Sequence, residues 1–157
     1  MIATALVIVV LGQSAPDPEL TPGSSDPTVT QETVQQTICR HGYTKSVRHV
    51  TESEKRRVIA AYLAKHPEWP HCGPLGKDAC EYDHRVSLEL GGSNEPDNLW
   101  PQPYCPLPRQ TACYGAREKD VVETEFHRLI CAGALSLAEA RARILKDWVA
   151  EYLTLVR

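Results

Sequence analysis

The sequence lacks an excess of positive charge, and it has few aromatic residues and no Cys-x-x-Cys pair. It contains 17 Lys and Arg against 20 Asp and Glu, which gives a formal net charge of −3 with the histidines neutral. This balance excludes a chain that binds nucleic acid through bulk positive charge, so such binding would need a local basic face or a metal ion. Aromatic residues make up only 6% of the chain, but Trp69, Trp100 and Trp148 supply large core anchors.

The apolar start of the chain, residues 1–15, is uncharged and too short to span a bilayer as a helix. It is typical of the apolar core of a secretory signal, with small residues Gly12, Ser14 and Ala15 for cleavage, although the positive charges that usually precede this core are missing. A buried strand is the alternative interpretation. We expect a secreted or periplasmic protein with no membrane attachment after removal of the signal.

Residues 16–32 are rich in Pro, Ser, Asp and Thr. A segment of this composition buries little apolar surface on its own. We therefore predict a disordered linker over residues 16–32 and one folded domain over residues 33–157.

Six cysteines follow the signal-like segment, and an even number in an exported chain favours disulfides. Their spacing suggests two local pairs, Cys72–Cys80 and Cys105–Cys113, which leaves Cys39–Cys131 as a long-range pair. A structural zinc site is the alternative, but without a Cys-x-x-Cys pair it has little support.

Three helices are expected. Thr51 and Glu54 match a capping box at the start of the first, and Pro67 follows its end. The second covers residues 115–133, where Gly133 is a plausible stop, and the third begins at a further capping-box pattern, Ser136 with Glu139.

A short irregular hairpin is expected between the first two helices. Val86, Leu88 and Leu90 alternate as in a strand over residues 81–90, the pair Gly91-Gly92 breaks it, and a brief strand resumes at residues 98–100. Strands and helices together predict an α+β fold.

The hairpin carries the residues Asp83-His84, then "LGGSN" over residues 90–94, then "NLWPQ" over residues 98–102. This series resembles the motif of HNH nucleases, of the ββα-metal or His-Me finger type. The chain from about residue 37 to residue 148 is also similar to exported bacterial HNH-type proteins. The resemblance implies a ββα-metal core with flanking helices, here stapled by disulfides, and hydrolysis of phosphodiester bonds.

The chemistry of this reaction fits the residues of the motif. A histidine near its ordinary pKa can take a proton from water at neutral pH, which makes His84 the candidate general base. The resemblance implies that Asp83 is a metal ligand, and a carboxylate oxygen suits Mg²⁺ or Mn²⁺, with Zn²⁺ as the other candidate. We expect Asn98 to hydrogen-bond the loop backbone and so orient the histidine.

HNH-type helices usually supply a second metal ligand, and here the candidates are Glu123 and Asp120, with His127 less favoured because it lies nearer the helix end. We predict substrate contacts from Lys119, Arg117 and Arg85, in a groove that also includes Arg128 and Lys77. The alternative for Lys119 and Arg117 is pairing with nearby carboxylates.

The sequence therefore predicts an exported, metal-dependent endonuclease that acts on DNA or RNA. The alternative is an inactive, secreted, disulfide-rich binding domain that retains the HNH scaffold. We expect a monomer, and the sequence identifies no inhibitor protein.

Overall fold

The computed structural model describes residues 15–70, 72, 80–105 and 114–157. Their elements run in the order α1 (Tyr43–Val47), α2 (Glu52–Lys65), β1 (Cys80–His84), the 3₁₀ turns η1 (Leu88–Leu90) and η2 (Pro96–Asn98), β2 (Leu99–Pro103), α3 (Ala116–Cys131) and α4 (Leu137–Leu155). The predicted α+β class is confirmed: the described residues contain four α-helices and one two-stranded antiparallel sheet.

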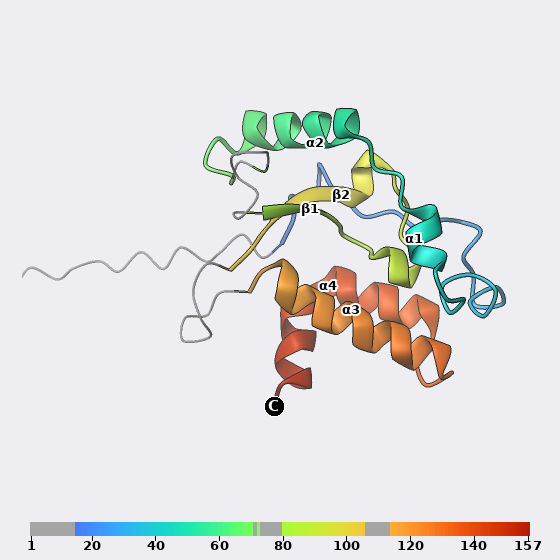
Figure 1. Ribbon diagram of the computed structural model, residues 1–157. Helices are drawn as coiled ribbons and strands as arrows, with labels where there is room; N and C mark the ends of the chain where they lie inside the picture. The colour runs from blue at the N-terminus through green and yellow to red at the C-terminus, as the bar shows by residue number, and fades with distance from the viewer. Residues whose placement is uncertain (1–14, 71, 73–79, 106–113) are drawn as a thin grey trace, which may run out of the picture.

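The hairpin of β1 and β2 lies between two helical layers, with α2 on one side and α3 and α4 on the other (Figure 1). The larger core joins α3 and α4 to η1, and includes Val122, Phe126, Ile130, Ile144 and Trp148. The smaller core joins α2 to β2, and includes Val58, Tyr62, Trp69, Leu99 and Trp100. The hairpin is therefore supported from both faces.

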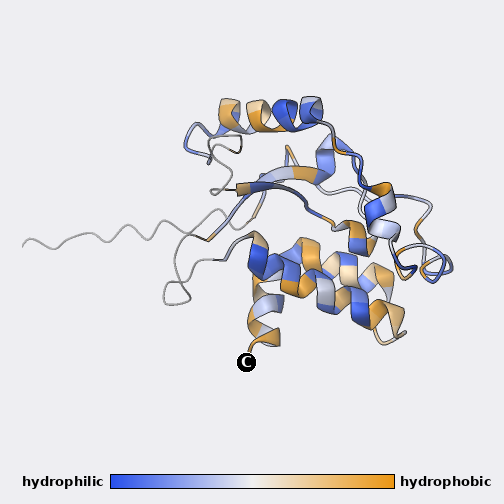
Figure 2. Ribbon diagram, in the orientation of Figure 1, coloured by the Kyte–Doolittle hydropathy of each residue, from blue (hydrophilic) through white to orange (hydrophobic). Residues whose placement is uncertain are grey.

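The predicted helices begin where their capping residues place them. The Thr51 side chain accepts a hydrogen bond from the backbone N–H of Glu54 at 3.2 Å, and the Glu54 carboxylate accepts one from the N–H of Thr51 at 2.7 Å. Ser136 accepts from the N–H of Glu139 at 3.2 Å. Apolar and polar residues alternate along α3 and α4 (Figure 2), as expected for helices that bury one face.

Helix α4 is kinked within its length, which the sequence pattern did not predict. Asp147 has non-helical backbone angles, φ −168° and ψ 83°. Its carboxylate accepts a hydrogen bond from the N–H of Ala150 at 3.0 Å, in the manner of an N-cap. Asp147 therefore both breaks the helix and serves as the N-cap of the segment that follows it.

The strand predicted over residues 81–90 is wrong in its second half. β1 ends at His84, and residues 88–90 form a 3₁₀ turn instead. The alternating apolar residues Val86, Leu88 and Leu90 are all buried, so their pattern correctly indicated burial. The pattern could not indicate strand pairing. The side chain of Asn98, and not a partner strand, forms the hydrogen bonds with the N–H and the carbonyl of Val86.

The linker predicted over residues 16–32 is also wrong, because this segment is ordered against both cores. The Thr21 hydroxyl is buried, donates to the carbonyl of Leu99 at 3.0 Å and lies 2.7 Å from the Tyr62 hydroxyl. Ser25 bridges to Gly92 in an antiparallel arrangement, and Val29 is buried in the larger core. Composition did not predict this packing, because the segment is held by contacts with residues that lie far away in the sequence.

Two of the predicted disulfides are confirmed, Cys39–Cys131 and Cys72–Cys80. Cys105 is also disulfide-bonded, and its predicted partner Cys113 lies outside the described residues. Such bonds are typical of an oxidising compartment. Of the predicted signal segment, residues 1–14 lie outside the described residues, and no described helix is long and apolar enough to cross a membrane.

The order of the segment around Thr21 can be tested by Thr21→Val. This change leaves the buried Leu99 carbonyl and the Tyr62 hydroxyl without their partner, so we expect the free energy of unfolding to fall by about 1–3 kcal/mol. Urea denaturation measures it. Thr154→Val, at an exposed position of α4, should change stability by no more than about 0.5 kcal/mol. Equal, small effects at both positions would show that the segment is not part of the fold.

Candidate functional site

The side chain of Asn98 holds the loop between β1 and β2. Asn98 is fully buried; its Oδ1 accepts from the N–H of Val86 at 2.8 Å, and its Nδ2 donates to the carbonyls of Val86 at 2.9 Å and Ser93 at 2.8 Å. These are the bonds to loop backbone expected of Asn98. They fix the end of β1, where His84 pairs with Leu99 in the strand register.

The two glycines of the loop are needed for different reasons. Gly91 has φ 70°, in the left-handed region that favours glycine. Gly92 passes so close to the backbone that a Cβ there would lie 1.7 Å from the carbonyl oxygen of Val86. A side chain at either position would therefore move the loop that follows His84.

His84 is 2% exposed, and its orientation is set by Asn94. The Asn94 amide donates through Nδ2 to the carbonyl of Val47 at 2.7 Å, which leaves its Oδ1 facing His84 Nε2 at 3.2 Å. Because that oxygen only accepts, Nε2 carries the hydrogen and Nδ1 keeps the lone pair in the neutral imidazole. The ring is therefore arranged to accept a proton at Nδ1.

Burial lowers the pKa of His84 below its ordinary value of 6.5, and the nearby charge of Asp83 only partly opposes this effect. A neutral imidazole is the form that can act as a general base. The protein thus holds His84 in the form required for proton abstraction at neutral pH.

A cleft of about 480 Å³ opens beside His84. Its lining residues are Arg48, Val50, Glu52, Lys55, Cys72, Cys80, Glu81, Tyr82, His84 and Tyr104. Four of these residues bind one another in pairs. Lys55 forms an ion pair with Glu52 at 2.7 Å, and the Tyr104 hydroxyl donates a hydrogen bond to the Glu81 carboxylate at 2.5 Å. His84 therefore lines an open cleft although little of its surface is exposed.

Behind the hairpin, Lys119 of α3 is buried between two carboxylates. Its ammonium donates to Asp83 Oδ2 at 2.6 Å, to the carbonyl of His84 at 2.8 Å and to Glu123 Oε1. These three partners match the three donors of an ammonium group. The predicted role of Lys119 as a phosphate contact is therefore corrected: the side chain is 2% exposed, and it joins α3 to β1.

The ionisation of this cluster follows from its burial. Burial opposes the charged form of Lys119, but attraction to Asp83 and Glu123 outweighs it and raises the pKa of Lys119. Burial raises the pKa of Glu123 to about 8, against the attraction of Lys119. Asp83 is therefore the principal counter-ion of Lys119, and Glu123 can take up a proton near neutral pH.

The other predicted substrate contacts lie in different environments. Arg85 is half-buried and donates to the carbonyl of Thr21 at 2.5 Å, so it holds the N-terminal segment. Arg117 is exposed and lies over the ring of Tyr104, 5.3 Å from the ring centroid. Arg128 is paired with Glu125 at 2.6 Å. Lys77 lies outside the described residues. Of the predicted contacts, Lys119 and Arg85 are used within the fold.

The candidate metal ligands are brought together only in part. Asp83 and Glu123 both contact one ammonium group, so a cation already lies between them. Asp120 is exposed as a whole residue, but its carboxyl is partly shielded from water. This partial burial, together with the negative charge of Asp83, raises the pKa of the Asp120 carboxyl. Carboxylate oxygens are suitable for Mg²⁺ or Mn²⁺, and Mg²⁺ commonly uses only one or two of them, with waters and phosphate as further ligands. Lys119 occupies one carboxylate oxygen of Asp83 and one of Glu123, whereas Asp120 is exposed.

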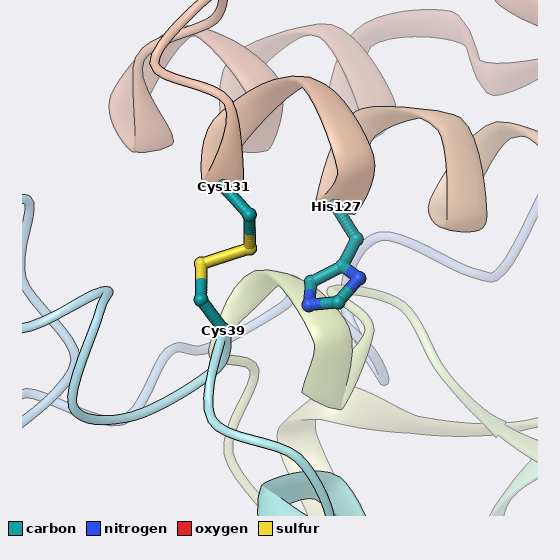
Figure 3. Close-up of side chains that lie close together, drawn as sticks. All are labelled: Cys39, His127 and Cys131. Carbon is teal, nitrogen blue, oxygen red and sulfur yellow. A yellow bond between two sulfur atoms is a disulfide. The ribbon is translucent and has the colours of Figure 1, made fainter.

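His127 lies elsewhere, beside the Cys39–Cys131 disulfide (Figure 3). Among the described residues, these three form the only group of three or more His, Cys, Asp or Glu whose ligand atoms lie within 4.8 Å of one another. Such a group could hold a metal ion only after reduction, because each sulfur is bonded to the other. His127 also contacts the carbonyl of Ile38 through Nε2 at 2.9 Å.

Comparison of the chain with models of protein families, with curated proteins and with solved structures finds no match.

The role of Asn94 was not predicted, and pairing of Lys119 with carboxylates was predicted only as the alternative to a phosphate contact. The spacing of four residues between Lys119 and Glu123 is a signal for a helical ion pair that was available in the sequence. No local signal indicated that Asn94 orients His84, because the second bond of its amide is made to Val47, in another part of the chain.

The Lys119 cluster predicts an order of effects for two substitutions. Lys119→Met leaves buried carboxylates without their cation and should lower the free energy of unfolding by about 3–5 kcal/mol. Glu123→Gln resembles the protonated carboxyl and should cost less, about 1–2 kcal/mol. Chemical denaturation at neutral pH compares the two, and equal losses would contradict the assignment of Asp83 as the principal counter-ion.

The lowered pKa of His84 predicts a pH dependence of stability. As the pH falls, the unfolded chain binds a proton at an ordinary histidine before the folded chain does. The buried neutral ring therefore contributes stability that is complete above about pH 6.5 and is lost as the pH falls through the lower folded pKa. Urea denaturation in EDTA should show a steeper decline between about pH 7 and pH 5 for the native chain than for His84→Asn. His41→Asn, at an exposed position, should follow the native curve, and parallel curves for all three would contradict the pKa shift.

Proposed function

We propose that this protein is an exported, metal-dependent endonuclease of the HNH type that hydrolyses phosphodiester bonds of DNA or RNA. The observation that carries the proposal is the placement of His84. It ends a β-strand, is oriented by Asn94 next to a loop closed by Asn98, and lines an open cleft. The helix α3 follows the hairpin and contributes carboxylates beside Asp83, which is the order expected of a ββα-metal core.

In this mechanism His84 takes a proton from a water molecule in the cleft at its free Nδ1, and the water attacks phosphorus. A divalent cation, when bound, stabilises the negative charge that develops on the phosphate and the leaving oxygen. Asp83 and Asp120 would hold this cation. Asp83 uses only one of its two carboxylate oxygens for Lys119, and Asp120 is exposed. Lys119 and Glu123 are positioning residues that hold Asp83 and the end of β1.

The disulfides support the exported location, since they persist in oxidising compartments. A second function, that of an inactive binding domain, is favoured by one observation: the Lys119 ammonium lies between the two carboxylates predicted to share a metal ion. In that case the hairpin and its loop serve only as a scaffold.

The direct test is cleavage by the oxidised protein of plasmid DNA and of RNA, each with Mg²⁺, Mn²⁺ or EDTA. We expect cutting in the presence of metal, none in EDTA, and a loss of at least about a hundredfold in rate for His84→Ala, because the general base is removed. Thr154→Ala is the control and should cut at the native rate, since it alters an exposed side chain of α4 outside the cleft.

Asp120→Asn should likewise reduce cutting while the protein stays folded, because Asp120 is exposed and the amide loses the charge that would bind the metal. If the folded, fully oxidised protein cuts neither polymer with any metal, the scaffold function replaces the nuclease. Cutting that persists in His84→Ala would place the base elsewhere.

A further inference from the structure

Arg48 is a charged side chain of the cleft to which the proposed function gives no role. It lies in the turn between α1 and α2, is exposed, and lines the cleft together with His84. Lys55, the other cation of the cleft, is paired with Glu52. Arg48 has no ion pair with any carboxylate in the described part of the chain, so its donors are available to a ligand.

Arg48 and His84 line the same cleft. An anion that binds in this cleft next to the imidazole would be within reach of the Arg48 guanidinium.

The segment that carries Arg48 is basic in an acidic chain. Residues 40–57 contain six Lys or Arg and only two Glu, whereas the whole chain has a net charge of −3. Five of the six cations are exposed: Arg40, Lys45, Arg48, Arg56 and Arg57. This segment is a local excess of exposed positive charge, which an acidic chain needs in order to bind nucleic acid.

We infer that Arg48 binds a backbone phosphate of nucleic acid in the His84 cleft, and that residues 40–57 form the surface along which the strand continues. This inference depends on the proposed nuclease function for its substrate. It replaces the groove predicted from Lys119, Arg117 and Arg85, two of which are occupied in holding the fold together. A guanidinium suits the role because its planar donors can grip two phosphate oxygens at once.

Binding can be measured without cleavage in the His84→Ala background. The probes are a short fluorescein-labelled DNA duplex and an RNA of the same sequence, each titrated by fluorescence anisotropy at several salt concentrations. Arg48→Ala should raise Kd about tenfold and reduce the slope of log K against log salt by about one. Arg48→Lys should keep the slope but recover only part of the affinity, since it keeps the charge and loses the paired donors.

Arg128→Ala is the matched control, because it removes the same charge from an exposed arginine on α3, outside the cleft. It should leave Kd within about twofold. An unchanged Kd and slope for Arg48→Ala, or equal effects of the two alanine variants, would overturn the inference. So would the absence of binding to either probe.

The outcomes separate the two proposals. If the native protein cuts and Arg48→Ala binds normally, the nuclease stands and the inference fails. If Arg48→Ala loses affinity but the native protein cuts nothing, the phosphate site stands and the nuclease fails. Melting temperatures equal to that of the His84→Ala parent would confirm that the Arg48 variants are folded.

Discussion

The structure depends on one buried charge, the ammonium of Lys119. A buried ion is favourable only when its partners are well placed, and here three acceptors meet its three donors. The two from β1 are a side chain and a backbone carbonyl of successive residues, Asp83 and His84. The link therefore fixes both the position of the strand against α3 and the point at which the strand ends. The position of the His84 imidazole therefore depends on an interaction with Lys119, which does not line the cleft.

The loop after β1 is the second constraint, and it explains where sequence reasoning succeeded and failed. The motif residues His84, Asn98 and the two glycines could be recognised from their order, and the hydrogen bonds of Asn98 to the loop could be anticipated from its chemistry. The residue at which the strand ends could not be predicted, because an alternating apolar pattern indicates which residues are buried and not which backbone groups pair with another strand. Val86 is buried as a strand residue would be, yet its backbone groups bond to a side chain.

The N-terminal segment shows the same limit at a larger scale. Residues 16–32 have the composition of a linker, and composition measures what a segment can bury by itself. Here Thr21 reaches between Tyr62 and Leu99, and Val29 enters a core formed mainly by α3 and α4. The capping residues of the helices, by contrast, act within a single turn, and for that reason Thr51 and Ser136 were sufficient to locate two helix starts.

The Cys39–Cys131 bond has a consequence for the durability of the site. Arg48, His84, Asn98 and Lys119 all lie between these two cysteines in the chain, so the bond encloses them in a single covalent ring. Hydrolysis of one peptide bond within the ring opens it without releasing a fragment, and the two pieces stay tethered. In surroundings rich in proteases, a nick in an exposed turn such as the one before α2 would thus leave the parts of the site still held together.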